Sequence, residues 1–207
     1  GALYSNTTGT RNIAIGRGAY DLADTEDDNL AIGYDALGGS INGGEFNVAI
    51  GNYSLGVNTS GDYNTAVGYN TLTANTTGGY NTAMGVYALS ANTTGTAITA
   101  MGHQALSANT TGGYNTASGY QALQANTTGT YNTAMGPYAL KTNINGNNNA
   151  ASGYRALLSN TTGDQNSAMG MNALQGNTGG NDNTSLGYTA GDIITTGSNN
   201  VVLGSGS

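Results

Sequence analysis

Small, apolar and polar residues return along this chain with a period of 17 residues. A Gly marks each unit, and one step of 18 interrupts the spacing; these landmark Gly are Gly16, Gly33, Gly51, Gly68, Gly85, Gly102, Gly119, Gly136, Gly153, Gly170, Gly187 and Gly204. Counted from the Gly, an idealised unit reads G-Y-x-A-L-x-A-N-T-T-G-x-Y-N-T-A-M. A fixed period of this length is the signature of a repeat architecture.

Two apolar columns recur within the unit. Leu follows the Gly by four residues in nine units, and Ile, Val, Met or Leu directly precedes the Gly at ten of twelve places, Ser118 and Ser152 taking the other two. The alternation in N-T-A-M-G is typical of a β-strand, and the unit shows no 3.6-residue apolar spacing. We predict one strand per unit, with Asn, Ala and Gly facing inward and Tyr, Thr and Met facing outward.

The rest of the unit is expected to complete one coil. A-L-x-A-N is predicted as a second short extended segment, and N-T-T-G-x as a turn in which Asn and Gly take strained backbone conformations. The extra residue falls in the Gly-rich segment 38–44. We expect an all-β, parallel β-solenoid of about twelve coils over residues 1–207, stacked about 4.8 Å apart.

An Asn column is the most regular polar feature. Its members lie four residues before each landmark Gly, with Ile98 in one place: Asn12, Asn29, Asn47, Asn64, Asn81, Asn115, Asn132, Asn149, Asn166, Asn183 and Asn200. Stacked amides can hydrogen-bond to their own copies and to turn backbones, so we predict an inward structural ladder. Replacing Asn109, in the N-T-T-G turn, by Ala is expected to cost less stability than Asn115→Leu.

Composition favours assembly over a self-sufficient core. Charged residues make up 7% of the chain and aromatic residues 7%, with 35 Gly, one Phe and no Cys. Ordering a 17-residue coil costs more free energy than a Leu, a Met or Ile and two Ala return on burial. We therefore expect a homotrimer around an axis along the rod, with Leu inside each coil and the Met column toward the axis.

Charge and hydropathy exclude several classes of function. The net charge is −7 with four basic residues, too few to neutralise a line of phosphates, so nucleic-acid binding is not expected. No apolar run approaches about 20 residues, so this segment is not expected to insert in a membrane. The chain starts within a repeat, as expected of a mature product or a segment of a longer fibre.

Candidate chemistry is sparse. His103 is the only His and takes a column held elsewhere by Tyr, and Lys141 lacks the glycines of a phosphate loop. We expect no enzyme activity and no cofactor. The acidic run supplies a weak calcium candidate in Asp24, Glu26, Asp27 and Asp28, with a solvated loop as the simpler interpretation.

Tyr columns and Asn-x-Ser/Thr triplets each leave alternatives. The Tyr columns have three possible roles: packing between chains, carbohydrate binding, or covering the edge of the coil. Their members are Tyr63, Tyr80, Tyr114 and Tyr131 before the Asn, and Tyr34, Tyr69, Tyr120, Tyr154 and Tyr188 after the Gly. The triplets at Asn6, Asn52, Asn58, Asn75, Asn92, Asn109, Asn126, Asn160 and Asn183 are interpreted as turn chemistry. Glycans are wider than the coil spacing, which argues against full occupancy.

Two motifs carry a family resemblance over nearly the whole chain. Asn12-Ile13-Ala14-Ile15-Gly16 and Asn64-Thr65-Ala66-Val67-Gly68 resemble head repeats of trimeric autotransporter adhesins, the YadA-like left-handed β-roll. The longer unit, with G-Y-N-T-A-M-G followed by A-L-S-A-N-T-T-G, is similar to repeats of phage and other viral tail-fibre proteins. The resemblance implies a left-handed, trimeric solenoid on a cell surface or virion.

These observations predict a structural fibre or adhesin shaft, extracellular or on a virion tail fibre. Its expected partners are two further copies of itself and, at the surface, a host glycan or protein. The alternatives are a filament or sheath subunit that joins end to end, and an ice-binding solenoid suggested by the Thr columns. Ice binding is less favoured because the Thr-Thr pairs lie in the predicted turn.

Overall fold

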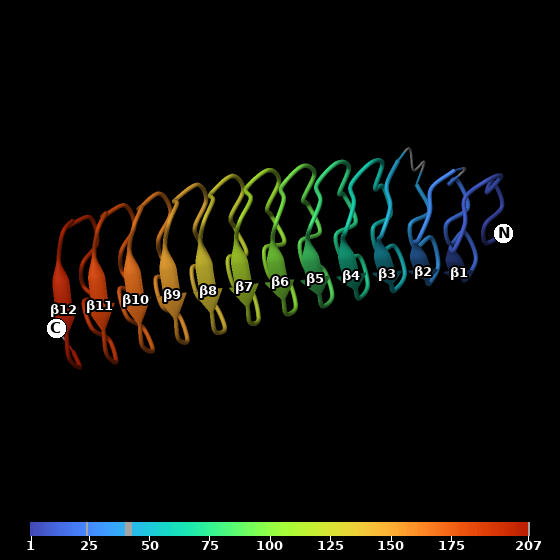
Figure 1. Ribbon diagram of the computed structural model, residues 1–207. Coiled ribbons are helices and arrows are strands. Elements are labelled where there is room, and N and C mark those ends of the chain that lie inside the picture. The colour runs from blue at the N-terminus through green and yellow to red at the C-terminus, as the bar shows by residue number, and fades with distance from the viewer. Residues whose placement is uncertain (24, 40–42, 207) are drawn as a thin grey trace.

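The computed structural model describes residues 1–23, 25–39 and 43–206, which wind into one continuous rod with its termini at opposite ends (Figure 1). Each coil contributes one three-residue strand, and the strands are β1 (Ile13–Ile15), β2 (Leu30–Ile32), β3 (Val48–Ile50), β4 (Thr65–Val67), β5 (Thr82–Met84), β6 (Thr99–Met101), β7 (Thr116–Ser118), β8 (Thr133–Met135), β9 (Ala150–Ser152), β10 (Ser167–Met169), β11 (Thr184–Leu186) and β12 (Val201–Leu203). The regular elements of the described residues are all strands.

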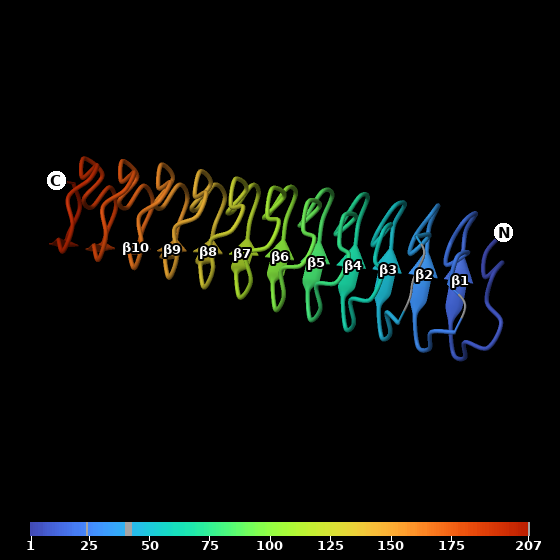
Figure 2. The same ribbon diagram turned by 90° about the horizontal axis from the view of Figure 1, so that it is seen from above.

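The strands form a single parallel sheet of twelve strands in chain order, aligned along one side of the rod (Figure 2). Pairing is in register at a separation of 17, so that Thr82 lies beside Thr99 and Ala83 beside Ala100. The one step of 18 joins β2 to β3, where Leu30 pairs with Val48. The parallel β-solenoid with 17-residue coils is confirmed, and the extra residue belongs to the coil that contains the undescribed residues 40–42.

The prediction of a second extended segment in each coil is wrong. At the start of A-L-x-A-N, left-handed residues alternate with right-handed ones. In a representative coil Tyr87, just before the segment, has φ 58° and Leu89, within it, has φ 54°. Tyr87 N–H donates to the carbonyl of Tyr69 in the preceding coil at 3.0 Å, whereas Leu89 N–H donates to Ala105 in the following coil at 2.9 Å. The left-handed residues, which are unfavourable for L-amino acids, are thus held by hydrogen bonds to both neighbouring coils.

Each landmark Gly ends a strand under steric constraint. Gly85 has φ 129°, and a Cβ there would lie 2.7 Å from the carbonyl oxygen of Gly102 in the next coil. A side chain would force the coils apart, so the recurrence of Gly reflects close approach between neighbouring backbones.

The core is a narrow column of small and branched side chains. The central residue of most strands is a buried Ala, and the Ala and Leu that follow the landmark Gly by three and four residues are also buried. The strand prediction is confirmed in its facing: Ala83 is buried, Thr82 is half-buried and Met84 is exposed. In the first coil Tyr20 takes the place of the Leu and is buried.

Candidate interaction surfaces

The predicted Asn column forms a hydrogen-bonded ladder inside the rod, here called the first ladder. Asn64 N–H donates to Asn47 Oδ1 at 2.9 Å, and Asn64 Nδ2 donates to the carbonyl of Gly78 at 2.9 Å. Nine members are buried, and Asn12 and Asn200 in the terminal coils are half-buried. A ladder side chain such as Asn64 therefore satisfies both a backbone donor and a backbone acceptor of the following coil, the N–H of Asn81 and the carbonyl of Gly78.

A second Asn ladder was missed by sequence reasoning. Its members lie ten residues before a landmark Gly, and eight of them are buried: Asn58, Asn75, Asn92, Asn109, Asn126, Asn143, Asn160 and Asn177. Asn92 Nδ2 donates to Asn75 Oδ1 at 2.9 Å and to the carbonyl of Gly95 at 3.0 Å. The expectation that Asn109 lies in an outward turn is wrong, because its side chain is enclosed and bonds to two coils. The smaller cost expected of Asn109→Ala stays a prediction. The regular recurrence of this Asn was the available signal.

The two ladders meet at one backbone carbonyl in most of the coils, as at Gly78, Gly95 and Gly129. Gly95 O accepts from Asn92 Nδ2 of the second ladder and from Asn81 Nδ2 of the first ladder, the latter at 2.9 Å. Ile98 breaks the first ladder. Its N–H still donates to Asn81 Oδ1 at 3.0 Å, but it has no side-chain amide to accept from the next coil. Within the described residues the N–H of Asn115 consequently has no hydrogen-bond partner.

Burial of the ladders also decides where the Asn-x-Ser/Thr triplets lie. Seven of the nine acceptor Asn are ladder members with enclosed side chains: Asn58, Asn75, Asn92, Asn109, Asn126, Asn160 and Asn183. Asn52 is exposed and Asn6 is half-buried. A glycan on any of the seven would displace the ladder hydrogen bonds of the folded rod.

The outward side of the sheet, here called the outer strand face, carries no charged residue. It comprises the first and third residue of every strand, and fourteen of these positions hold large aliphatic residues: Ile13, Ile15, Leu30, Ile32, Val48, Ile50, Val67, Met84, Met101, Met135, Met169, Leu186, Val201 and Leu203. The remaining ten are Thr, Ser or Ala. An uncharged strip thus follows the whole rod, with large aliphatic residues on every strand except β7 and β9, and its Met side chains are about half exposed, as with Met135 at 53%.

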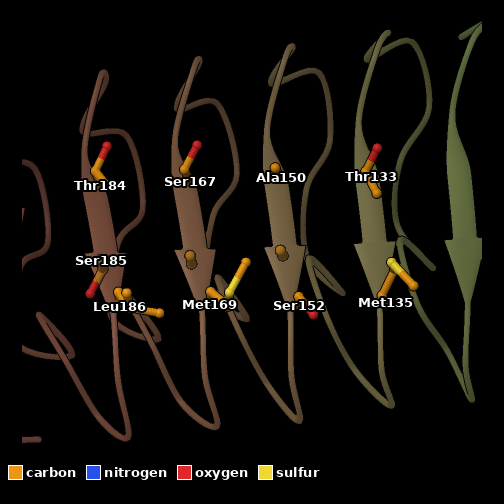
Figure 3. A pocket seen from close by; sticks show the side chains of 11 residues that line it. Thr133, Met135, Ala150, Ser152, Ser167, Met169, Thr184, Ser185 and Leu186 are labelled. Carbon is orange, nitrogen blue, oxygen red and sulfur yellow. The ribbon is translucent and has the colours of Figure 1, made fainter. Parts of the chain in front are cut away.

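A shallow hollow interrupts this face over β8 to β11 (Figure 3). Small residues at Ala150 and Ser152 leave space between the side chains of Met135 and Met169. The hollow has a volume of about 430 Å³ and is lined almost entirely by carbon atoms. It is a local widening of the outer strand face rather than a separate site.

The Tyr columns form two kinds of ladder. Before the first-ladder Asn the rings are nearly parallel: Phe46, Tyr63 and Tyr80 stack with centroids 4.9 and 5.1 Å apart. Ala97 ends this stack, and Tyr114 and Tyr131 begin another at 5.0 Å. After the landmark Gly the rings instead meet edge to face, in the series Tyr34, Tyr53, Tyr69 and Tyr87 and in the series Tyr120, Tyr138 and Tyr154.

The acidic run does not converge on one point. Glu26 is buried and its Oε1 accepts from Gly43 N–H at 2.9 Å, whereas Asp28 pairs with Arg11 at 2.6 Å. Asp27 accepts from the backbone and hydroxyl of Thr10, which lowers the pKa of its carboxyl, and the Arg11 hydrogen bond lowers the pKa of Asp28. Asp24 lies outside the described residues. In the described residues no group of three or more His, Cys, Asp or Glu side chains is placed to hold a metal ion.

Neither of the residues considered for chemistry gains a catalytic partner. His103 stacks on Tyr120 with centroids 5.4 Å apart, and Lys141 lies over the ring of Tyr138 at 5.2 Å. Both contacts are with aromatic side chains.

Comparison with family models, with curated proteins and with solved structures found no match to this chain. Among the described residues, no helix has the length and apolar character needed to cross a bilayer. The fold places the chain in the class of parallel β-solenoids, and function rests on the surfaces described above.

Proposed function

We propose that this chain is the shaft segment of an extracellular or virion-surface fibre, in which three identical left-handed solenoids pack side by side around a common axis. The single observation that carries this proposal is the outer strand face, which is uncharged from β1 to β12 and carries large aliphatic residues on ten of the twelve strands, all but β7 and β9. Exposed apolar patches of this extent mark sites of association.

The outer strand face is long and narrow. Twelve coils at about 4.8 Å each give a face about 55 Å long, and a three-residue strand is about 10 Å wide. The product is roughly 550 Å² per chain, which is about two thirds of the 800 Å² or so that each partner contributes to a specific complex of standard size. A monomer would leave this entire area in water.

A rotation axis parallel to the rod suits the repeat. Each level of one chain then meets the same level of its copies, so Met135 lies near two further copies of Met135 and no charge is brought to the axis. The hollow at Ala150 and Ser152 would form a wider layer at its own level. Because every strand repeats the same facing, the contact extends over any number of coils.

The role that follows is to extend and project, as a rigid rod, whatever binding parts a longer fibre carries. Backbone hydrogen bonds link each coil to both neighbours around most of its circumference. Thr82 N–H donates to the carbonyl of Ile98 in the following coil at 2.8 Å, and Gly85 N–H donates to the carbonyl of Val67 in the preceding coil at 2.8 Å. Such bonding makes a straight spacer without disulfides.

Sedimentation velocity and mass photometry test the proposal on the unaltered chain. A trimer has a mass of about 62 kDa, three times the 20.7 kDa of one chain. Met135→Asp, which would place three carboxylates at one level of the axis, is expected to abolish assembly. Thr128→Asp, at an exposed position of the turn, is the matched control and should leave assembly unchanged.

A folded 20.7 kDa monomer at nanomolar concentration would refute the trimer. An open-ended series of masses that grows with concentration would favour the filament or sheath subunit instead. A trimer that survives Met135→Asp would show that another face forms the contact.

A further inference from the structure

Two of the four cations of this acidic chain lie together on aromatic rings, at a place that the shaft role does not use. Lys141 Nζ lies 5.2 Å from the ring centroid of Tyr138, and the Arg155 guanidinium lies 5.9 Å from the same ring and 4.9 Å from that of Tyr154. Tyr120 meets Tyr138 edge to face at 5.2 Å. We call these five residues the cation–aromatic patch.

The cations of this patch have no acidic partner. Over the described parts of the chain, both ion pairs found belong to Arg11, with Asp27 and Asp28. Lys141 and Arg155 are held by the rings alone, although the chain carries eleven acidic residues. A guanidinium held over a ring by a cation–π contact still has its N–H fork to offer, which matches a carboxylate or sulfate.

Glutamine amides extend the patch over the two preceding coils. Gln121 Nε2 and Gln124 Nε2 both donate to Gln104 Oε1, at 2.7 and 3.1 Å. Their own Oε1 atoms make no hydrogen bond within the described residues, so two oriented acceptors remain beside the rings. From Gln104 to Arg155 the surface spans three coil steps, or about 15 Å.

We propose that the cation–aromatic patch binds an acidic saccharide, with its carboxylate or sulfate on Arg155 and Lys141. The sugar hydroxyls donate to Gln121 and Gln124, and an apolar C–H face of the sugar rests on Tyr120 and Tyr154, the two exposed rings of the patch. This assignment rests on the proposed fibre role, for which it names the class of surface receptor and the place of attachment.

Other anionic partners fit the patch less well. Two cations on a chain of net charge −7 cannot neutralise a nucleic acid backbone. An extended peptide would need unpaired backbone donors and acceptors, and here the coils use theirs on one another, as in Tyr138 N–H to Tyr120 O at 2.9 Å. Aromatic faces, amide acceptors and a single anion site are the groups that an acidic sugar requires.

The test is titration of the full chain with 3′-sialyllactose, 6-sulfolactose and neutral lactose, followed by isothermal calorimetry or ligand-observed NMR. We expect at least one acidic sugar to bind about tenfold more tightly than lactose, since only the acidic sugars engage the two cations. The two acidic probes distinguish a carboxylate receptor from a sulfated one. Arg155→Gln should lower the affinity about tenfold and remove the preference over lactose.

Arg17→Gln is the matched control, because Arg17 lies over one ring, that of Tyr34 at 5.9 Å, and lies outside the patch. It should leave binding unchanged. Equal affinity for lactose and the acidic sugars, no binding of either acidic sugar, or equal losses from Arg155→Gln and Arg17→Gln would each overturn the assignment. Mass photometry on the same samples separates the two proposals. A trimer that binds neither acidic sugar would refute saccharide binding at the patch but not the trimer. A monomer that binds an acidic sugar would refute the trimer but not saccharide binding.

Discussion

Replacing Asn132 by Leu tests whether the first ladder stabilises the rod. Asn132 Oδ1 accepts from the N–H of Asn149 at 3.0 Å and from its Nδ2 at 3.2 Å, and Asn132 Nδ2 donates to Gly146 O at 2.8 Å. Leu keeps the branching and the number of heavy atoms of Asn, so the change replaces hydrogen-bonding groups by methyl groups and leaves no cavity. Its own N–H can still donate to Asn115 Oδ1.

The expected cost follows from the groups left without a partner. The N–H of Asn149 would be buried and unsatisfied, which costs about 1–3 kcal/mol. Losing the donor to Gly146 O adds about 1 kcal/mol, although Asn143 Nδ2 still reaches that oxygen at 3.0 Å. We expect the free energy of unfolding to fall by about 2–4 kcal/mol.

The assay is urea unfolding followed by circular dichroism at a fixed chain concentration, with Asn145→Leu as the control. Asn145 is exposed and lies in the turn of a neighbouring coil, so the same chemical change there should stay within about 0.5 kcal/mol of the unaltered chain. Equal effects of Asn132→Leu and Asn145→Leu would refute the ladder as a source of stability.

Three further outcomes are expected. Ile98→Asn would offer an acceptor to Asn115 N–H and should slow hydrogen exchange of that amide several-fold; unchanged exchange would contradict the break in the ladder. Burial raises the pKa of Tyr20 to about 12 from 10.0, so its contribution to stability is complete below pH 10 and is lost as pH rises through about 12. Unfolding curves of Tyr20→Phe at alkaline pH should lack that loss. Curves identical to those of the unaltered chain would argue against burial of the Tyr20 hydroxyl. The lowered pKa of Asp27 and Asp28 contributes stability above their ordinary pKa that is lost as pH falls through the lowered values. Exchange of the Thr10 amide, which donates to Asp27, should therefore quicken selectively in acid, and a uniform response of all coils would count against this pairing.

Much of the fold follows from the sequence because a strict period determines the stacking partner. Once residue 82 must lie beside residue 99, the alternation of N-T-A-M-G leaves Ala in the core and Met outside, as observed. The inward direction of the first-ladder Asn follows from the same alternation. The acidic sequence around Asp27 also indicated an irregular loop near one end of the rod. The ion pair between Asp27 and Arg11 was not predicted.

Tertiary structure alone decided how the rest of the coil is built. The 17-residue period determines which residues stack, but it does not determine the sign of φ. Because Tyr87 and Leu89 are left-handed, the expected second strand is replaced by a segment whose N–H groups donate alternately to the preceding and the following coil. That path carries Asn92 into the interior as part of the second ladder. It also brings Lys141 and Arg155, fourteen residues apart in the chain, onto one ring, because side-chain direction outside the strand depends on hydrogen bonds between coils.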